Sequence, residues 1–170
     1  MNERVYNVLF LCTGNSARSI IAESLLNTLG KGRFRAFSAG SHPGVTVNPL
    51  VLAHLRSLQL ITEGARSKSW DEFARDDAPR MDLIITVCDQ AAGELCPVWP
   101  GMPAEAHWGA PDPAAYMDDP EKARAVIREV TQLLQRRISL LINLPMATLD
   151  RMSLQAETRA IAAQSEHAQA

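Results

Sequence analysis

A buried strand that leads through a short loop into a helix is the feature of this sequence that most constrains its fold. Residues 5–11 form an apolar run of the kind found in a strand covered on both faces. From Ser19 onward the apolar residues follow helical spacing, and Gly30 ends that pattern. Residues 12–18 therefore form a loop between the end of a strand and the N-terminus of a helix.

The alternation of strands and helices continues along the chain. The pattern predicts three further strands, at 35–39, 82–87 and 104–107. It also predicts two further helices, at 49–58 and 120–144. Asn48 with Pro49, and Asp119, are residues that begin helices. Strands that alternate with helices form a parallel sheet covered on both sides. We therefore expect an α/β fold: a single three-layer domain with a short parallel sheet of about four strands flanked by helices.

The length of the chain is that of one domain. A chain of 170 residues folds around one core and buries on the order of 70% of the surface that its unfolded form exposes. We assign residues 1–145 to this domain and residues 146–170 to a C-terminal helical extension. The apolar pattern of the extension is weak, so we expect a surface helix that frays into a disordered tail from Gln164, rather than an oligomer contact.

Composition excludes several classes of function. The formal net charge is -2, so no bulk electrostatic attraction to nucleic acid is expected. No apolar run approaches the roughly 20 residues that cross a bilayer, and the start of the sequence lacks the pattern of a signal peptide. The three cysteines, an odd number, argue for reduced thiols rather than structural disulfides. We expect a cytoplasmic protein that binds neither nucleic acid nor membrane.

The loop after the first strand has the composition of an oxyanion site. Backbone N–H groups of a turn at a helix N-terminus converge on one point and hold a tetrahedral anion there. Gly14 and Asn15 suit the left-handed backbone that such a turn requires. Arg18 is placed to bind two oxygens with its planar guanidinium. The expected anion-binding residues are Thr13, Gly14, Asn15, Ser16, Ala17 and Arg18.

Cys12 is expected to lie directly beneath the bound anion. The positive potential of the helix N-terminus and of Arg18 lowers the pKa of a nearby thiol, and the Ser19 hydroxyl is placed to donate to the sulfur. We therefore expect a Cys12 thiolate at neutral pH that acts as a nucleophile. The alternative is a small buried cysteine at the end of a strand. The strand before it, the helix after it and the residue types of the loop favour the nucleophile.

The loop sequence carries a family resemblance. The segment CTGNSARS at residues 12–19, preceded by VLFL, resembles the phosphate-binding loop of the low-molecular-weight phosphotyrosine phosphatases and of the arsenate reductases that share their fold. The resemblance extends from about residue 5 to about residue 142 and includes Ser38-Ala39-Gly40. It implies that fold, with Cys12 as the nucleophile and with Arg18 and Ser19 as catalytic residues beside it.

Asp112 is the candidate general acid. It lies in the segment HWGAPDP at residues 107–113, which is similar to the acid loop of the same family. A carboxylic acid on a proline-stiffened loop can protonate the leaving group. Because an Asp-Pro pair alone usually marks only a turn, the assignment of Asp112 depends on the resemblance.

Cys88 and Cys96 bear on the choice between a reductase and a phosphatase. Reducing arsenate to arsenite takes two electrons, most simply from a second thiol, whereas a phosphatase finishes with water. Cys88 follows the strand at 82–87 and therefore lies at the carboxyl edge of the sheet, as Cys12 does. The resemblance to three-cysteine arsenate reductases implies a relay in which Cys88 attacks Cys12 and Cys96 then attacks Cys88. The alternative is a pair of ordinary buried thiols.

A disulfide between Cys88 and Cys96 requires a change of local structure. A regular helix over residues 89–95 would separate the two residues by about 12 Å, which is too far for a disulfide. The segment would have to unwind for the bond to form. In thioredoxin-linked members of the family the pair is one residue closer together, so glutathione with glutaredoxin is an alternative to thioredoxin as the reductant.

We predict no required cofactor and no metal ligands. Some members of the family bind a potassium ion close to the loop, and Asn15, Ser38 and Ser67 match its ligands. Ser69, however, stands where a carboxylate is expected. Potassium is therefore possible here on resemblance but is not predicted.

Two other functions compete with an arsenate reductase that acts in arsenic detoxification. A low-molecular-weight protein-tyrosine phosphatase would use the same loop and acid, but the adjacent tyrosines usual after the acid are missing, because residues 114–115 are both alanine and only Tyr116 lies beyond. A non-catalytic oxyanion sensor or redox-responsive binding module would bind the anion without turnover. Replacing Asp112 separates these classes, since a sensor keeps its response while either enzyme slows.

Overall fold

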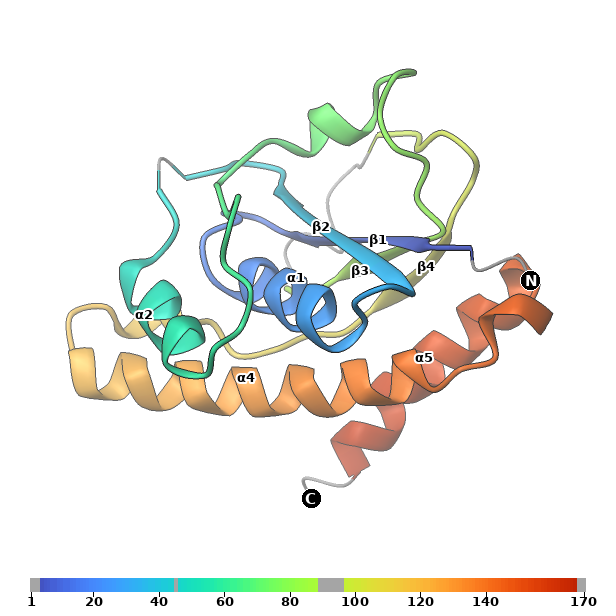
Figure 1. Ribbon diagram of the computed structural model, residues 1–170. Helices are drawn as coiled ribbons and strands as arrows, with labels where there is room; N and C mark the ends of the chain where they lie inside the picture. Colours follow the sequence, from blue (N-terminus) through green and yellow to red (C-terminus); the bar gives the residue numbers. More distant parts are fainter. Residues whose placement is uncertain (1–3, 45, 89–96, 168–170) are drawn as a thin grey trace.

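A parallel sheet of four strands forms the centre of the protein (Figure 1). The computed structural model describes residues 4–44, 46–88 and 97–167. The strands are β1 (Tyr6–Cys12), β2 (Phe34–Gly40), β3 (Leu83–Thr86) and β4 (Ala104–His107). Their order in the sheet is β2-β1-β3-β4, and every pair is parallel. The short parallel sheet expected from the sequence is confirmed.

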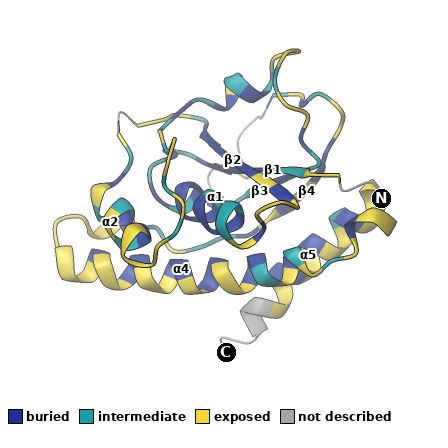
Figure 2. Cartoon of the chain, in the orientation of Figure 1, coloured by how far each residue is buried: buried dark blue, intermediate teal, exposed yellow. Residues whose placement is uncertain are grey.

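The longer helices lie together on one face of this sheet (Figure 1). They are α1 (Arg18–Leu29), α2 (Pro49–Ser57), α4 (Pro120–Ile142) and α5 (Arg151–His167). The short 3-10 helix η1 (Trp70–Phe73) covers the other face, while η2 (Pro113–Tyr116) and η3 (Met146–Thr148) lie in connections. Figure 2 shows that α4 turns its buried residues toward the sheet and its exposed residues away from it.

Two apolar clusters on opposite faces of the sheet explain the unbroken apolar run of β1. Successive side chains of a strand point to opposite faces, so Val8 and Phe10 pack in the cluster beneath α1 and α4. Leu9 and Leu11 pack in a second cluster with Trp70 of η1. Both faces of β1 are thus covered, which confirms the three layers. Cys12 follows the even-numbered residues, and its side chain lies on the helical face.

The element boundaries follow the residue types that the sequence supplies. The Asn48 side chain accepts from the backbone N–H of Leu50 at 2.9 Å, and Pro49 is the first residue of α2. Asp119 accepts in the same way at the start of α4. Each strand and helix predicted above for the described residues is present, with bounds within two residues of the expected ones. The helix considered for residues 89–95 lies outside the described residues.

The C-terminal extension is more firmly attached than its sequence pattern suggested. Leu154 and Ile161 of α5 are buried, and the Trp108 indole N–H donates to the Thr158 carbonyl at 2.9 Å. The helix continues to His167, beyond the point at Gln164 where fraying was expected. α5 lies at the surface as expected, but its inner side packs on β4 and α4. No described helix is long and apolar enough to cross a membrane.

Candidate active site

The loop between β1 and α1 is held in one orientation by hydrogen bonds on its outer side. Four of its carbonyl groups accept from backbone N–H groups of the segment 41–48. The pairs are Cys12 O with Ser41 N at 3.3 Å, Thr13 O with His42 N at 2.9 Å, Gly14 O with Gly44 N at 2.9 Å and Ser16 O with Asn48 N at 3.0 Å. In a trans peptide the C=O and the following N–H point in opposite directions. The amides of residues 13–15 and 17 therefore point to the inner side of the loop, as an oxyanion site requires.

The start of α1 adds further donors to the inner side of the loop. Its N-cap residue is Ala17, which has no side-chain acceptor to satisfy the first-turn amides. The N-terminus of α1 is therefore suited to an anion. The left-handed backbone expected within the loop occurs at Asn15, where φ is 49°. It does not occur at Gly14, so that part of the expectation was wrong.

Cys12 lies at the base of the loop with two donors close to its sulfur. The side chain is buried, with 3% of its surface exposed. The backbone N–H of Asn15 donates to Cys12 Sγ at 3.2 Å, and Ser19 Oγ lies 3.2 Å from the same sulfur. Both contacts are of the kind that stabilises a thiolate, as the sequence indicated. The structure thus places Cys12, Asn15 and Ser19 together.

A third contact acts against these donors. A side-chain hydrogen bond with Cys88 favours the protonated form of Cys12, and together with burial it raises the pKa of Cys12. Ser19 and the Asn15 amide lower this pKa, but they do not outweigh Cys88 and burial. The contact with Cys88 thus acts against the Cys12 thiolate expected from the sequence, and the sequence does not reveal this contact.

Cys88 lies where parallel topology predicted, at the carboxyl edge of the sheet beside Cys12. It follows β3, and the neighbouring Val87 N–H donates to the Leu11 carbonyl at 2.8 Å. Cys88 Sγ lies 3.5 Å from Thr13 Oγ1, and only 2% of its residue surface is exposed. Neither Cys12 nor Cys88 is in a disulfide. Cys96, the third cysteine of the expected relay, lies outside the described residues.

Arg18 and Asp112 face each other across the opening of the loop. Arg18 Nη2 lies 3.4 Å from Asp112 Oδ2, and Arg18 Nη1 donates to the Ala110 carbonyl at 3.1 Å. The other Asp112 oxygen accepts from the backbone N–H of Ala114 at 2.9 Å, which fixes the carboxyl group at the start of η2. Its side chain is 45% exposed. The predicted anion-binding arginine and the predicted acid are thus brought together at the loop.

The acid loop rests on a buried cation that the sequence did not single out. Arg137 of α4 is 1% exposed and donates to the Gly109 carbonyl at 3.0 Å. Buried arginines are rare unless their donors are satisfied, and a position in a long amphipathic helix gives no sign of such a partner. Arg137 therefore supports the backbone that precedes Asp112.

A second buried cation lies behind the loop. Lys68 has a 7% exposed side chain, and its backbone N–H donates to Asn15 Oδ1 at 2.9 Å. Its ammonium nitrogen lies 3.4 Å from Ser38 Oγ and 4.0 Å from Glu23 Oε2. Burial lowers the pKa of Lys68, and burial raises the pKa of Glu23. Ser38 belongs to the segment that carries the family resemblance, whereas Lys68 and Glu23 each look like an ordinary surface charge in the sequence and were not predicted.

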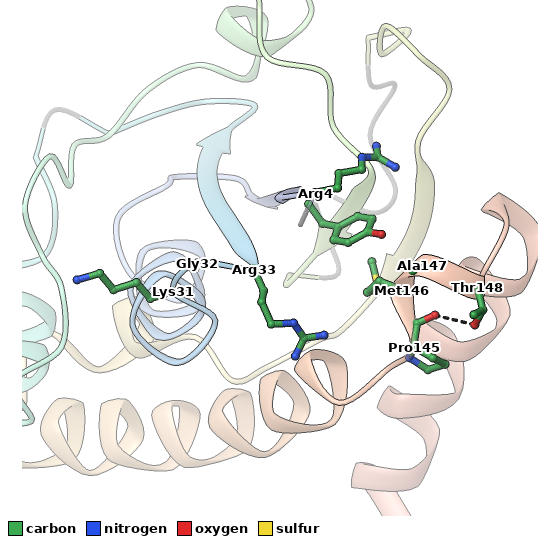
Figure 3. A pocket seen from close by; sticks show the side chains of 9 residues that line it. Arg4, Lys31, Gly32, Arg33, Pro145, Met146, Ala147 and Thr148 are labelled. Atoms are coloured by element: carbon green, nitrogen blue, oxygen red, sulfur yellow. Dashed lines mark hydrogen bonds between the residues drawn. The ribbon is translucent and has the colours of Figure 1, made fainter. Parts of the chain in front are cut away.

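A basic cavity of about 510 Å³ lies at the opposite edge of the sheet, where β1 and β2 begin (Figure 3). Arg4, Lys31 and Arg33 contribute its positive charge. Arg33 donates to the Ile142 carbonyl at 2.8 Å, and Arg4 forms an ion pair with Asp82. The two arginines thus bind groups of the fold itself, and the cavity lies away from Cys12. Within the described ranges, no group of three His, Cys, Asp or Glu side chains is arranged to hold a metal ion.

Proteins that are similar to this chain in sequence or fold include arsenate reductases and a phosphatase. The family model for low molecular weight phosphotyrosine protein phosphatase matches residues 7–155. An arsenate reductase of Halalkalibacterium halodurans is 33% identical over 138 residues, which is 81% of this chain and 94% of that protein.

Two solved structures are similar as well. One is an arsenate reductase in the phosphate binding state, with a TM-score of 0.61 and 28% identity over 79% of this chain and 97% of the other. The second is a thioredoxin-dependent arsenate reductase of Corynebacterium glutamicum, with a TM-score of 0.58 and 28% identity over 82% of this chain and 65% of the other. The chain belongs to the low molecular weight phosphotyrosine protein phosphatase family.

Proposed function

We propose that this protein is an arsenate reductase that detoxifies arsenate, with Cys12 as nucleophile and Cys88 as the first source of electrons. The observation that carries the proposal is a second buried thiol at the oxyanion loop: Cys88 Sγ lies 3.5 Å from Thr13 Oγ1 of the loop, and Cys88 forms a side-chain hydrogen bond with Cys12. A phosphatase can use a second thiol at that place only to protect its nucleophile, whereas arsenate reduction needs one for turnover. The arsenate reductases to which the chain is similar support the same assignment.

The first step forms a bond between sulfur and arsenic. The inward amides of the loop, the N-terminus of α1 and Arg18 hold arsenate over Cys12 Sγ. The sulfur attacks arsenic, and Asp112 protonates the hydroxyl group that leaves as water. The net proton comes from the Cys12 thiol, so the products are a Cys12 thioarsenate and water. Arsenic is still in the +5 state after this step.

The second step transfers two electrons to arsenic. Cys88 attacks Cys12 Sγ, the S–S bond forms, and the S–As bond breaks with its electron pair on arsenic, which leaves as arsenite and takes up the proton lost by the Cys88 thiol. Cys96 then attacks Cys88, which frees Cys12 and moves the disulfide to Cys88 and Cys96. Two electrons and two protons, from one dithiol or from two monothiols, restore both thiols. Thioredoxin, or glutathione with glutaredoxin, has this chemistry, and the relay starts from reduced thiols as in the cytoplasm.

The proposal is tested by measuring arsenite formation with each reductant. The wild type should form arsenite in the presence of thioredoxin and its reductase, or of glutathione and glutaredoxin, and Cys12→Ser should form none. Asp112→Asn should slow arsenite formation by about 10²- to 10⁴-fold, the usual contribution of a general acid, while phosphate still binds. Arsenate binding without turnover in the wild type would instead indicate a sensor.

A low-molecular-weight protein-tyrosine phosphatase is the second candidate, because the family model that matches the chain carries that activity in its name. It would hydrolyse an aryl phosphate with Cys12 and Asp112. Its turnover would survive Cys88→Ser, whereas arsenite formation would not. Assaying both substrates with this one variant therefore separates the two candidates.

A further inference from the structure

The buried pair of Glu23 and Lys68 has no part in the proposed chemistry, yet it lies directly behind the oxyanion loop. Lys68 is 7% exposed and Glu23 16% exposed on their side chains. Placing two charges out of water costs free energy that is recovered only with good partners. Ser38 is one such partner, because it donates to Glu23 Oε1 at 3.2 Å and accepts from Lys68 Nζ at 3.4 Å. The Lys68 ammonium also donates to the Arg66 carbonyl at 3.0 Å.

A short chain of hydrogen bonds links Lys68 to the nucleophile. The Lys68 backbone N–H donates to Asn15 Oδ1 at 2.9 Å, and Asn15 Nδ2 donates to Ser19 Oγ at 2.8 Å. Ser19 Oγ lies 3.2 Å from Cys12 Sγ. On the other side, the Lys68 carbonyl accepts from the Gly40 N–H at 2.9 Å. A shift of Lys68 would therefore be passed to Asn15 and Ser19, which set the geometry around the sulfur.

The residues around Lys68 do not fit a bound potassium ion. Such an ion needs several oxygen ligands around one point, and the family resemblance offers Asn15, Ser38 and Ser67. The Ser67 hydroxyl donates to the Gly14 carbonyl of the loop at 3.0 Å. Asn15 Oδ1 already accepts from the Lys68 backbone, and Ser38 Oγ and Glu23 already face the Lys68 ammonium. Ser69, which stands where a carboxylate is expected, caps η1 by accepting from the Asp71 N–H at 3.1 Å. The ammonium thus takes the place and the charge that such an ion would bring.

We propose that Lys68 is a positioning residue whose ammonium, held between Glu23 and Ser38, is the built-in cation of the oxyanion loop and makes a potassium ion unnecessary. Lys68 and Glu23 line a cavity of about 390 Å³, which Arg66 and Glu72 also line. Arg66 donates to the two Glu72 carboxylate oxygens at 3.0 and 2.6 Å. Glu72 is therefore already paired, and Glu23 is the carboxylate that pairs with Lys68. The inference deepens the proposed function and relies on it only for the identity of the oxyanion.

The test measures the affinity for inorganic phosphate by calorimetry, in potassium chloride and in choline chloride at equal ionic strength. The wild type should bind phosphate equally in both salts. Lys68→Met should bind phosphate more weakly in choline, by roughly 2- to 30-fold as for an indirect coupling, and potassium should restore part of the loss. Lys31→Met, which removes an exposed lysine at the opposite edge of the sheet, should match the wild type.

A second variant keeps the test valid if Lys68→Met does not fold with Glu23 left unpaired. Lys68→Met with Glu23→Gln removes both charges, and it should bind phosphate weakly in both salts, since no carboxylate remains to hold potassium. The proposal is overturned if potassium strengthens phosphate binding to the wild type, or if the double variant binds phosphate like the wild type. Phosphate binding needs no arsenate reduction, so failure of the proposed function leaves this test intact.

Discussion

Cys12 and Cys88 form a pair in which each sulfur changes the chemistry of the other. The loop around Cys12 supplies the donors that a thiolate needs, but Cys88 and burial act in the opposite direction and raise the pKa of Cys12. The same contact that raises the pKa of Cys12 places the second thiol where it can attack a Cys12 intermediate. The reductase assignment thus accounts for the contact of Cys12 with Cys88, which in a phosphatase would raise the pKa of the nucleophile without supplying electrons that the reaction uses.

Removing Cys88 should make Cys12 more acidic. Because Cys88 raises the pKa of Cys12, Cys88→Ala lowers it, and the thiolate forms at lower pH. The rate of Cys12 alkylation by iodoacetamide, followed by mass spectrometry of the modified peptide, should therefore reach half its maximum at lower pH in Cys88→Ala than in the wild type. A half-maximum at the same or higher pH would contradict the account of this pair.

Gly40, where β2 ends, should tolerate no side chain. A Cβ atom there would overlap the Thr13 carbonyl oxygen and lie 3.1 Å from Asn15 Cβ, so the loop itself would have to move. Gly40→Ala should lower the free energy of unfolding in urea by about 1–3 kcal/mol and weaken phosphate binding. The control is Gly44→Ala, whose Cβ would meet nothing closer than 3.7 Å. Equal phosphate affinity in Gly40→Ala and the control would show that the loop is not constrained in this way.

At the scale of elements, α5 completes the edge of the sheet that β4 would otherwise expose. An edge strand presents unpaired backbone groups to solvent. The Gln155 side chain accepts from the Glu105 N–H at 3.0 Å, and Arg159 Nε donates to the Glu105 carbonyl at 3.2 Å. Together with the bond from Trp108 to Thr158, these contacts attach α5 to the strand that leads into the acid loop.

The stability of the protein should therefore depend on the buried side of α5. Ile161 is 3% exposed, and Ile161→Ala should lower the free energy of unfolding by about 2–5 kcal/mol. Met152 of the same helix is 75% exposed, and Met152→Ala should change that free energy by no more than about 0.5 kcal/mol. Urea unfolding curves of the two variants measure the difference, and equal midpoints would mean that α5 does not belong to the core.

At the scale of the whole molecule, the sequence predicted what depends on local pattern. Alternation of apolar strands and helices gave the parallel sheet, and parallel topology placed Cys88 beside Cys12, because the carboxyl ends of all strands lie on one edge. The spacing of Cys12 and Arg18 indicated the oxyanion loop, because both residues lie in one short segment between a strand and a helix. These features depend on residues close in sequence or on a general rule of topology.

The parts that escaped prediction depend on contacts between distant segments. The segment 41–48 orients the loop through backbone hydrogen bonds, and no periodic pattern in its sequence indicates this role. Lys68 likewise holds Asn15 through one backbone hydrogen bond, which its residue type does not reveal. The pKa of Cys12 depends on Cys88, which is remote in sequence. The few apolar residues of α5 gave too weak a stripe to indicate that it packs on β4.

The most direct test of the reductase is to count free thiols in the reduced protein after adding arsenate without any reductant. The account predicts that the wild type loses two thiols per chain, that Cys88→Ser loses none to an intramolecular disulfide, and that phosphate causes no loss in either protein. Unchanged thiols in the wild type, together with hydrolysis of an aryl phosphate that persists in Cys88→Ser, would contradict the reductase and leave a phosphatase.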